Sequence, residues 1–284
     1  MSSLPANRVL AREIVVLEQC HSTHQLLRQR VEEDGAASPQ SPPSMLMLAE
    51  SQIFGKGRRR PDWWSGPPRC NIAASLLLEP VQPPETLGLH AACAVADAIH
   101  PLLAAARAMP QVAAPGPAVA LKWPNDILLA GAKVGGVLVE VSERRGQPFA
   151  ILSLGMNFLV APPADAAPYP TTAVIDHTGD VSHTGDVSHK RDVDRSRFLA
   201  AWLWALEKRL GWARANGHLQ LEQSFLPLLK RWAPLGVLDP ATGDGGPLVE
   251  FSVQRGLTWG LKGSTKTRPL GWIPALEALP APQP

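Results

Sequence analysis

The sequence has little of what marks secreted, membrane or nucleic-acid-binding proteins. Its three cysteines, Cys20, Cys70 and Cys93, are too few for a disulfide framework and lack the spacing of a zinc site, which indicates a reducing compartment. With 27 basic and 25 acidic side chains the formal net charge is only +2, so no strongly charged surface for nucleic acid or acidic lipid is expected. No apolar run approaches the roughly 20 residues of a membrane helix, and no secretory apolar region opens the chain. We therefore predict a cytoplasmic protein that binds neither nucleic acid nor membrane.

What the chain does have is enough apolar sequence for a sizeable core. It contains 284 residues, of which 45% are hydrophobic and 18% charged, so extensive intrinsic disorder is excluded. This length suits one large domain plus a small one, or two modest domains.

Proline is abundant, with 29 residues, and its clusters mark the segments that we expect to be loops. Repeated prolines remove backbone donors and fix φ, so neither a helix nor a central strand continues through them. The clusters lie at Glu32–Pro43, Met109–Pro117, Pro162–Pro170 and Pro280–Pro284. The hexapeptide HTGDVS occurs at His177–Ser182 and again at His183–Ser188, which is too short for a repeat architecture and predicts a duplicated surface loop. We interpret His177, His183 and His189 as part of this loop rather than as metal ligands.

Between these loops, short apolar segments alternate with longer helical patterns. Apolar residues recur at near-helical spacing within Thr86–Ala106, and again from Ser196, a candidate N-cap, to Trp212. The segments Asp126–Leu129 and Val134–Val141 flank a turn with glycine and predict a β-hairpin. Further strands are expected at Ile14–Leu17, Met45–Ala49, Asn71–Leu78, Ala118–Trp123 and Phe149–Val160. Strands mixed with helices, including a hairpin, indicate an α+β fold with a mixed sheet rather than a doubly wound one.

One segment of chemical interest is Gly55–Trp64, with the sequence GKGRRRPDWW. Glycines at alternate positions allow the backbone to approach a ligand, and the interleaved cations suit a phosphate or carboxylate. The two tryptophans could cover a ring. A solvated basic loop explains the composition equally well. The segment is not a P-loop, because the terminal GK[ST] is absent.

A second segment combines the sequence KWPND, Lys122–Asp126, with KVGGVLVE, Lys133–Glu140. It brings two lysines and an aspartate onto one predicted hairpin, beside paired glycines that indicate close backbone approach within a strand. An ordinary turn would account for Pro124 and the polar residues after it, so this motif alone is ambiguous.

Taken in order along the chain, the motifs resemble the biotin–protein ligases in their short form, without an N-terminal DNA-binding domain. The resemblance rests on Ser22-Thr23 in HSTHQLL, Gln52 with GKGRRRPDWWS, LKWPNDILLAGAKVGGVLVE at Leu121–Glu140, and LSLGMNF at Leu152–Phe158. It implies a class II synthetase-like catalytic domain over residues 1–232. A small SH3-like β-barrel is implied over residues 233–284, where Val249, Phe251 and Val253 alternate as in a strand.

The resemblance also implies an activity. Members of that family use ATP to convert biotin into biotinyl-5'-AMP and then transfer the biotinyl group to a lysine of the biotin carboxyl carrier protein of acetyl-CoA carboxylase or a related carboxylase. ATP, biotin and Mg²⁺ would be required, and a monomer or homodimer is expected.

Matching the family motifs residue by residue implies the following site. Arg58 and Lys133 would be the catalytic cations, and Asp126 would serve the metal or the acceptor lysine. The biotin-binding residues would be Ser22, Thr23, Gln52, Lys56, Arg58, Trp63, Lys133, Gly135 and Gly136. The ATP-binding residues would be Lys56, Arg58, Arg59, Trp63, Asn125 and Asn157.

Three positions depart from the family pattern. His24 replaces the usual Asn, Lys56 replaces Arg, and Arg60 replaces Gly. Two alternatives therefore stay open: a lipoate-type acyl ligase on the same fold, and a degenerate module that binds biotin or adenylate. A biotin-responsive repressor is not expected, since only about twenty residues precede Ser22, too few for a helix-turn-helix domain.

Overall fold

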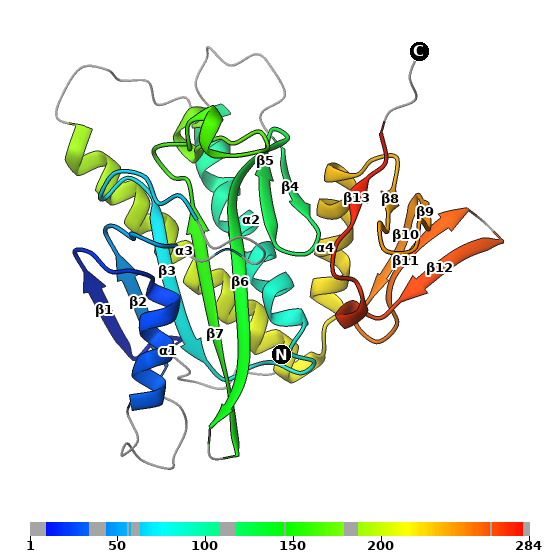
Figure 1. Ribbon diagram of the computed structural model, residues 1–284, viewed down its shortest axis with the longest axis horizontal. Coiled ribbons are helices and arrows are strands. Elements are labelled where there is room, and N and C mark those ends of the chain that lie inside the picture. The colour runs from blue at the N-terminus through cyan, green and yellow to red at the C-terminus, as the bar shows by residue number, and fades with distance from the viewer. Residues whose placement is uncertain are drawn as a thin grey trace.

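The computed structural model describes residues 10–33, 44–55, 57, 63–107, 118–144, 146–178, 187–261 and 263–280. A seven-stranded sheet with helices on both faces is followed in the chain by a smaller β unit at its side (Figure 1). The strand order is β1-β2-β3-β7-β6-β5-β4. The strands are β1 (Glu13–Leu17), β2 (Met45–Ala49), β3 (Ile72–Leu78), β4 (Val119–Lys122), β5 (Asp126–Leu129), β6 (Ala132–Arg144) and β7 (Gln147–Met156). Only β1 and β2 pair in parallel, so the sheet is mixed, as predicted.

Helices cover the two faces of the sheet unequally. The short helix α1 (Thr23–Glu33) lies on one face, and α2 (Thr86–Arg107) and α3 (Val187–Asn216) lie on the other (Figure 1). Successive side chains of β3 serve both cores: Leu76 joins the cluster of α2 and α3, and Leu77 packs with α1. Burial on both faces explains why β3 is apolar along its whole length.

Helix α2 passes through the centre of the larger core. By length and composition, its Thr86–Ala104 stretch is the one helix in the described part of the chain that could cross a membrane. However, 67% of the apolar window is buried inside the protein, against the sheet and α3. That burial is typical of a core helix.

The structure confirms the predicted strands and hairpin but moves several boundaries. The strand predicted at Phe149–Val160 ends at Met156, because Asn71 Oδ1 accepts hydrogen bonds from the next backbone N–H groups, including that of Phe158 at 2.9 Å. The helix predicted from Ser196 is wrong at its start: α3 begins at Val187, so Ser196 lies inside the helix and the last residues of the second HTGDVS copy are helical rather than loop.

Two helices were not predicted. Helix α1 uses residues assigned only to a binding motif, and α4 (Leu219–Trp232) buries Leu221, Phe225, Leu228 and Leu229 along one face. The predicted loop at Met109–Pro117 lies outside the described residues, as do residues 34–43 of the first proline cluster.

The C-terminal unit packs against α4 and the KWPND turn. Phe251 contacts Phe225 of α4 with ring centroids 4.9 Å apart, and the Trp123 indole N–H donates to the carbonyl of Ile273 at 2.8 Å. Its strands are β8 (Val237–Leu238), β9 (Gly245–Gly246), β10 (Leu248–Ser252), β11 (Gly256–Leu261), β12 (Ser264–Arg268) and β13 (Glu277–Ala278).

These strands form two small sheets, β10-β11-β12 and β13-β8-β9, and in the described residues they do not close into one continuous barrel. The sheets are joined at one corner, where the Gly260 N–H donates to the carbonyl of Pro247 at 3.0 Å. A small β unit of this shape agrees with the expected SH3-like architecture.

Candidate active site

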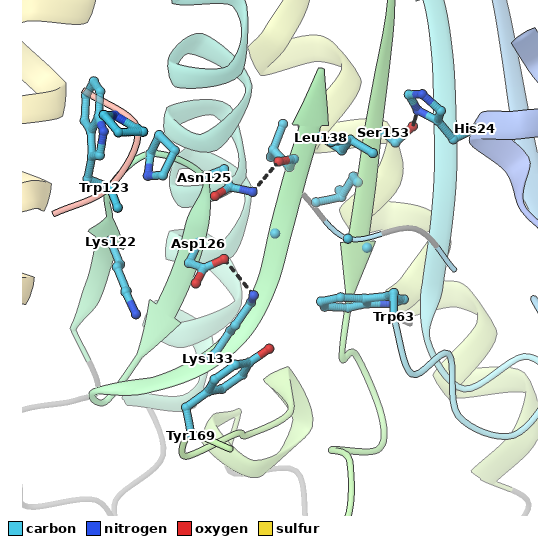
Figure 2. A pocket seen from close by; sticks show the side chains of 18 of the residues that line it. His24, Trp63, Lys122, Trp123, Asn125, Asp126, Lys133, Leu138, Ser153 and Tyr169 are labelled. Carbon is cyan, nitrogen blue, oxygen red and sulfur yellow. Dashed lines mark hydrogen bonds and ion pairs between the residues drawn. The ribbon is translucent and has the colours of Figure 1, made fainter. Parts of the chain in front are cut away.

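A cleft of about 440 Å³ lies between the sheet, the loop that carries Trp63 and the C-terminal unit. Polar side chains gather at its two ends, around His24 at one end and around Lys133 at the other, with β6 and β7 forming the floor between them (Figure 2). The cleft is lined by Ser22, Thr23, His24, Gln52, Gly57, Trp63, Ala74, Lys122–Asp126, Lys133, Gly136–Leu138, Ser153–Gly155, Pro168, Tyr169, Pro240 and Pro274–Glu277.

Most of the residues expected from the sequence motifs line this cleft. They are Ser22, Thr23, Gln52, Trp63, Asn125, Asp126, Lys133 and Gly136. Gly135 and Asn157 do not belong to the lining. Lys56, Arg58 and Arg59, together with the family departure Arg60, lie outside the described residues.

Lys133 and Asp126 form an ion pair at one end of the cleft. The Lys133 Nζ lies 2.6 Å from Asp126 Oδ1, and the two side chains are 15% and 19% exposed. The ring centroids of Tyr169 and Trp63 lie 5.0 and 5.7 Å from the same ammonium. Figure 2 shows the amine directed at the carboxylate with both rings nearby. The pair therefore places a cation, its counter-ion and two aromatic faces within one small volume.

A β-bulge positions Lys133. In the β5–β6 ladder, Ile127 pairs with Gly135 but Leu128 pairs with Lys133, which leaves Val134 as an extra residue. In a regular strand, residues three apart face opposite sides, yet Lys133 and Gly136 both line the cleft. The bulge thus turns the lysine toward Asp126.

The backbone of Lys133 is fixed as well. Its N–H donates to the carbonyl of Pro170 at 2.9 Å, and its own carbonyl accepts from the N–H of Thr172 at 3.0 Å. These bonds join the lysine to the segment that carries Tyr169, so both sides of the cation–π contact are held by the same backbone pairing.

The indole of Trp63 forms a wall of the cleft against β7. A β-carbon on Gly155 would lie 2.7 Å from Trp63 Cε2, and one on Gly55 would lie 2.7 Å from Trp63 Cβ. The ring can occupy this place only because both positions lack side chains. Gly135 plays a comparable part between strands, where a β-carbon would lie 2.9 Å from the carbonyl oxygen of Gly155.

The opposite end of the cleft is lined by hydroxyl and amide groups beside His24. The Gln52 Oε1 accepts from the backbone N–H of Thr23 at 2.8 Å and from its hydroxyl at 3.0 Å. Ser22 and Thr23 are buried at the start of α1, with Ser22 Oγ at 3.5 Å from the N–H of Gln25 as a weak helix cap. This end presents hydroxyl and amide groups that can match a neutral polar ring.

The two asparagines have mainly structural contacts. Asn125 donates through Nδ2 to the carbonyl of Val137 at 2.9 Å, which closes the KWPND turn onto β6. Asn157 is buried and donates to the carbonyl of Thr172 at 3.2 Å, while its buried Oδ1 has no hydrogen-bond partner among the described residues. Asn157 therefore supports the segment behind Lys133 rather than the cleft surface.

Several lining residues were not assigned from the sequence. His24 was noted only as a departure from the family, and Lys122 belongs to a motif but was given no role. Tyr169 is the single tyrosine of the chain. Ser153 belongs to the LSLGMNF motif but was given no role. The segment Pro274–Glu277 carried no sequence signal, because its contribution depends on contacts between segments far apart in the chain.

Comparison with known proteins shows to which class this fold and cleft belong. The chain belongs to the biotin/lipoate A/B protein ligase family, whose model matches residues 16–157, half of its length.

The curated relatives that the chain matches include biotin ligases. A biotin–[acetyl-CoA-carboxylase] ligase of Mycobacterium tuberculosis is 32% identical over 213 residues, which cover 73% of this chain and 68% of that protein. A protein of the same name from Paracoccus denitrificans is 33% identical over 141 residues, covering 48% of this chain and 54% of its own length. The biotin protein ligase of Aquifex aeolicus, solved with biotin and ATP, superposes over 94% of this chain and all of its own with a TM-score of 0.70 at 20% identity. This last likeness shows that the folds agree.

Proposed function

We propose that the protein is a biotin–protein ligase, which activates biotin with ATP and transfers the biotinyl group to a lysine of a carboxylase acceptor domain. The observation that carries the proposal is the cleft itself, with the Lys133–Asp126 pair at one end and the uncharged Ser22, Thr23 and Gln52 groups at the other. Biotin has this polarity: a neutral ureido ring, an apolar chain and a terminal carboxylate.

In the first step, an oxygen of the biotin carboxylate attacks the α-phosphorus of ATP. A carbon–oxygen–phosphorus anhydride forms, the bond to the β-phosphate breaks, and pyrophosphate leaves. Two anions must approach each other, so catalysis depends on positioning and on neutralising charge. We assign Lys133 to this junction, where its ammonium would exchange Asp126 for the substrate oxygens. Arg58 and Lys56 are assigned to the same anions by their places in the family's loop, where Lys56 stands at a position that is usually Arg.

The apolar middle of the cleft suits the valeryl chain of biotin. Trp63 supplies an aromatic wall, and Gly136 lines the same cleft, where an added β-carbon would lie in van der Waals contact with Asn125 O at 3.5 Å. We assign Trp63 to contacts with both the biotin chain and the adenylate, with Arg59 and Asn125 near the nucleotide. Asn157, which lies outside the lining, would act there only through the segment that it supports behind Lys133. Buried polar groups of biotin left without partners would each cost about 1–3 kcal/mol, so the groups at Ser22, Thr23 and Gln52 are assigned to its ureido ring.

In the second step, the amine of the acceptor lysine attacks the acyl carbon of biotinyl-5'-AMP. An amide bond forms and AMP leaves. The amine must first lose a proton, and Asp126 is the carboxylate beside the reacting junction. Once Lys133 pairs with the substrate anions, Asp126 is freed to accept a hydrogen bond from the incoming ammonium and to assist its deprotonation.

Magnesium fits this site as a partner of the nucleotide. The described residues contain no group of three His, Cys, Asp or Glu side chains that could hold a metal ion. Mg²⁺ in phosphate chemistry commonly takes only one or two protein carboxylates together with substrate phosphates. Asp126 is the protein ligand that we assign, and the ion would neutralise phosphate charge.

We assign residues 1–232 to the catalytic domain and 233–284 to the C-terminal domain, which adds Pro274–Glu277 to the cleft wall. The expected partner is the biotin carboxyl carrier protein of a carboxylase such as acetyl-CoA carboxylase, in the cytoplasm. A monomer or a homodimer is compatible with this assignment.

One observation separates biotin from lipoate as the substrate. The dithiolane ring of lipoate has no hydrogen-bonding N–H or carbonyl groups, and Thr23, Gln52 and Ser22 would then be buried against it with unmatched polar atoms. The polar end of the cleft therefore favours biotin over lipoate.

Purified protein incubated with ATP, Mg²⁺, biotin and a biotin carboxyl carrier domain tests the proposal. We expect biotin-dependent pyrophosphate release and one biotinyl group added to the carrier, detected by mass spectrometry. Lipoate in place of biotin, and a carrier with its acceptor lysine changed to arginine, are the matched controls. Labelling with lipoate but not with biotin would overturn the substrate assignment. Pyrophosphate release without carrier labelling would limit the activity to adenylation, and no turnover at all would leave a binding module.

A further inference from the structure

A continuous chain of hydrogen bonds runs from β6 to the polar end of the cleft through His24. The Nε2 of His24 lies 3.0 Å from Glu140 Oε2, and its Nδ1 lies 2.8 Å from Ser153 Oγ. Ser153 Oγ lies 2.7 Å from Ser75 Oγ, which lies 2.8 Å from Thr23 Oγ1. The chain ends at Gln52, 3.0 Å from the Thr23 hydroxyl. Figure 2 shows the His24–Ser153 contact at the far end of the cleft from Lys133.

Every contact in this chain has hydrogen-bond length, so every one needs a proton. The orientation of Gln52 is fixed, since the backbone N–H of Thr23 points at Oε1 and can only donate. Gln52 therefore accepts from the Thr23 hydroxyl, and that hydroxyl has no second proton to give to Ser75.

The donor of each remaining hydrogen bond can then be assigned in turn, from Thr23 back to His24. Ser75 must donate to Thr23, and Ser153 must donate to Ser75, because each hydroxyl carries one proton. Ser153 thus has none left for His24, and the His24 Nδ1 must donate to it. The Nε2 must also donate, because its partner is the Glu140 carboxylate. All five contacts are satisfied together only when the His24 ring carries both protons.

The surroundings of His24 are compatible with that charge. Helix α1 packs against β2, β3 and β7, which contain no acidic or basic residue. Among the residues that the structure describes, Glu140 on β6 pairs with His24, and Arg28 on α1 pairs with the same carboxylate, its Nη1 lying 3.0 Å from Glu140 Oε1. Arg28 is itself paired with the exposed Glu32. Glu140 can therefore serve two cations, one with each oxygen.

We propose that His24 is a positioning residue that, in its doubly protonated form, fixes the Thr23 hydroxyl and Gln52 for recognition of the ureido ring. A neutral ring supplies one proton fewer, so one contact fails, and Thr23 and Gln52 then face each other with two acceptor oxygens. With the cationic ring, the hydroxyls of Thr23 and Ser153 are both committed as donors within the chain and present lone pairs to the cleft. Those lone pairs suit the ureido N–H groups, while the Ser22 hydroxyl and Gln52 Nε2 remain to donate to the ureido carbonyl.

This inference rests on the proposed function, but its first test needs no ligand. Nitrogen-15 NMR of the ring nitrogens, assigned by comparison with His24→Gln, is followed from about pH 5.5 to about pH 8.5, where histidines titrate. We expect both nitrogens to be protonated at the acidic end and Nδ1 to lose its proton as the pH rises. A ring with a bare Nδ1 over the whole range would overturn the proposal.

The second test measures biotin binding by calorimetry over the same pH range. In the wild type, we expect affinity to fall about tenfold as the Nδ1 proton is lost, because one hydrogen bond to a charged group disappears. His24→Gln should bind biotin weakly at every pH, with unchanged ATP affinity. His100→Asn, an exposed histidine of α2, is the matched control and should follow the wild type.

Two results would contradict the assigned role. If His24→Gln bound biotin with the wild-type affinity and pH dependence, the hydrogen bonds from Ser153 to Gln52 would not depend on the His24 imidazole. An equal loss of ATP and biotin affinity would show that His24 only supports the fold. If the cationic ring were observed but the wild type bound no biotin, the proposed function would fail while the protonation of His24 would stand, so the two failures are distinguishable.

Discussion

Trp63 and Gly155 are mutually dependent: the indole occupies the space that a side chain on β7 would fill, with Trp63 Cε2 only 2.7 Å from an added β-carbon at Gly155. The Trp63 ring can therefore pack against this part of the cleft only because residue 155 is a glycine. Trp63 lies in the segment between β2 and β3, whereas Gly155 lies on β7. A side chain added at Gly155 would therefore displace the Trp63 ring.

Gly155→Ala should displace the Trp63 ring and raise KM for biotin and for ATP by about tenfold. It should also lower the free energy of unfolding by about 1–3 kcal/mol through overpacking. Steady-state kinetics and urea unfolding measure the two effects. Gly211→Ala in α3 is the control, because an added β-carbon there has no neighbour within 4 Å and favours the helix. Equal kinetics in the two variants would show that the ring position does not matter for substrate binding.

Lys133→Ala should lower the rate of biotin-dependent pyrophosphate release by about a hundredfold or more, because the variant loses a cation at the junction of two anions. The fold should be retained, since Asp126 remains part-exposed at the cleft surface. Lys208→Ala, which removes an exposed lysine of α3 stacked on Trp204, provides a matched loss of charge. Unchanged pyrophosphate release in Lys133→Ala would remove this lysine from the reaction.

Arg58 is assigned from its motif alone, and its test compares two substitutions. Arg58→Ala should cut adenylate formation strongly. Arg58→Lys should keep part of the activity, because lysine retains the charge but not the planar fork that grips two oxygens. Isolation of the biotinyl-5'-AMP formed in a single turnover measures both. If both variants formed it at the wild-type rate, the assignment would be wrong.

Away from the cleft, the pair His90–His218 predicts acid sensitivity. Burial, together with the nearby His218 ring, lowers the pKa of His90 from 6.5 to about 3. His218 Nε2 donates to the carbonyl of Gln82, so its Nδ1 accepts from His90 Nε2. In the part of the chain that the structure describes, the buried His90 Nδ1 has no partner for a proton. The unfolded chain thus binds a proton at a pH where the folded chain does not.

The stability that this arrangement provides is therefore complete above about pH 6.5 and decreases as the pH falls toward 3. Between pH 7 and pH 5, we expect His90 to account for a loss of about 2 kcal/mol in the free energy of unfolding. Urea unfolding at several pH values measures it, and His90→Gln should show a shallower slope. The same slope in both proteins would exclude His90 as its source.

The sequence predicts those parts of the fold that depend on residues close together in the chain. The hairpin at Asp126–Val141 follows from a turn between two apolar runs, and α2 from its apolar spacing. Helix α1 was missed because its mostly polar sequence buries little beyond its start, Leu27 and Val31, so its stability comes from contacts with the sheet. The start of α3 was misplaced because a serine inside a helix has the same sequence signal as an N-cap.

The site divides in the same way. Motif order predicts that Thr23, Gln52, Asp126 and Lys133 belong together, and the structure brings them to one cleft. Motif order could not reveal that Lys133 faces the cleft together with Gly136, because the bulge at Val134 leaves no trace in the sequence pattern. The role of Tyr169 was missed for a different reason. Its contact with Lys133 depends on the pairing of β6 with the proline-rich segment near Thr171, and no periodicity in the sequence predicts that pairing.

The contact between Trp123 and Ile273 joins residues that are 150 positions apart, and the cleft wall continues from there to Glu277. On a ribosome, the whole seven-stranded sheet emerges long before this wall can be assembled. A nascent chain that reaches only Trp232 would hold the large sheet and its helices but an unfinished site. The cleft would thus be completed only after Glu277 has left the ribosome, when the large sheet and its helices can already have formed.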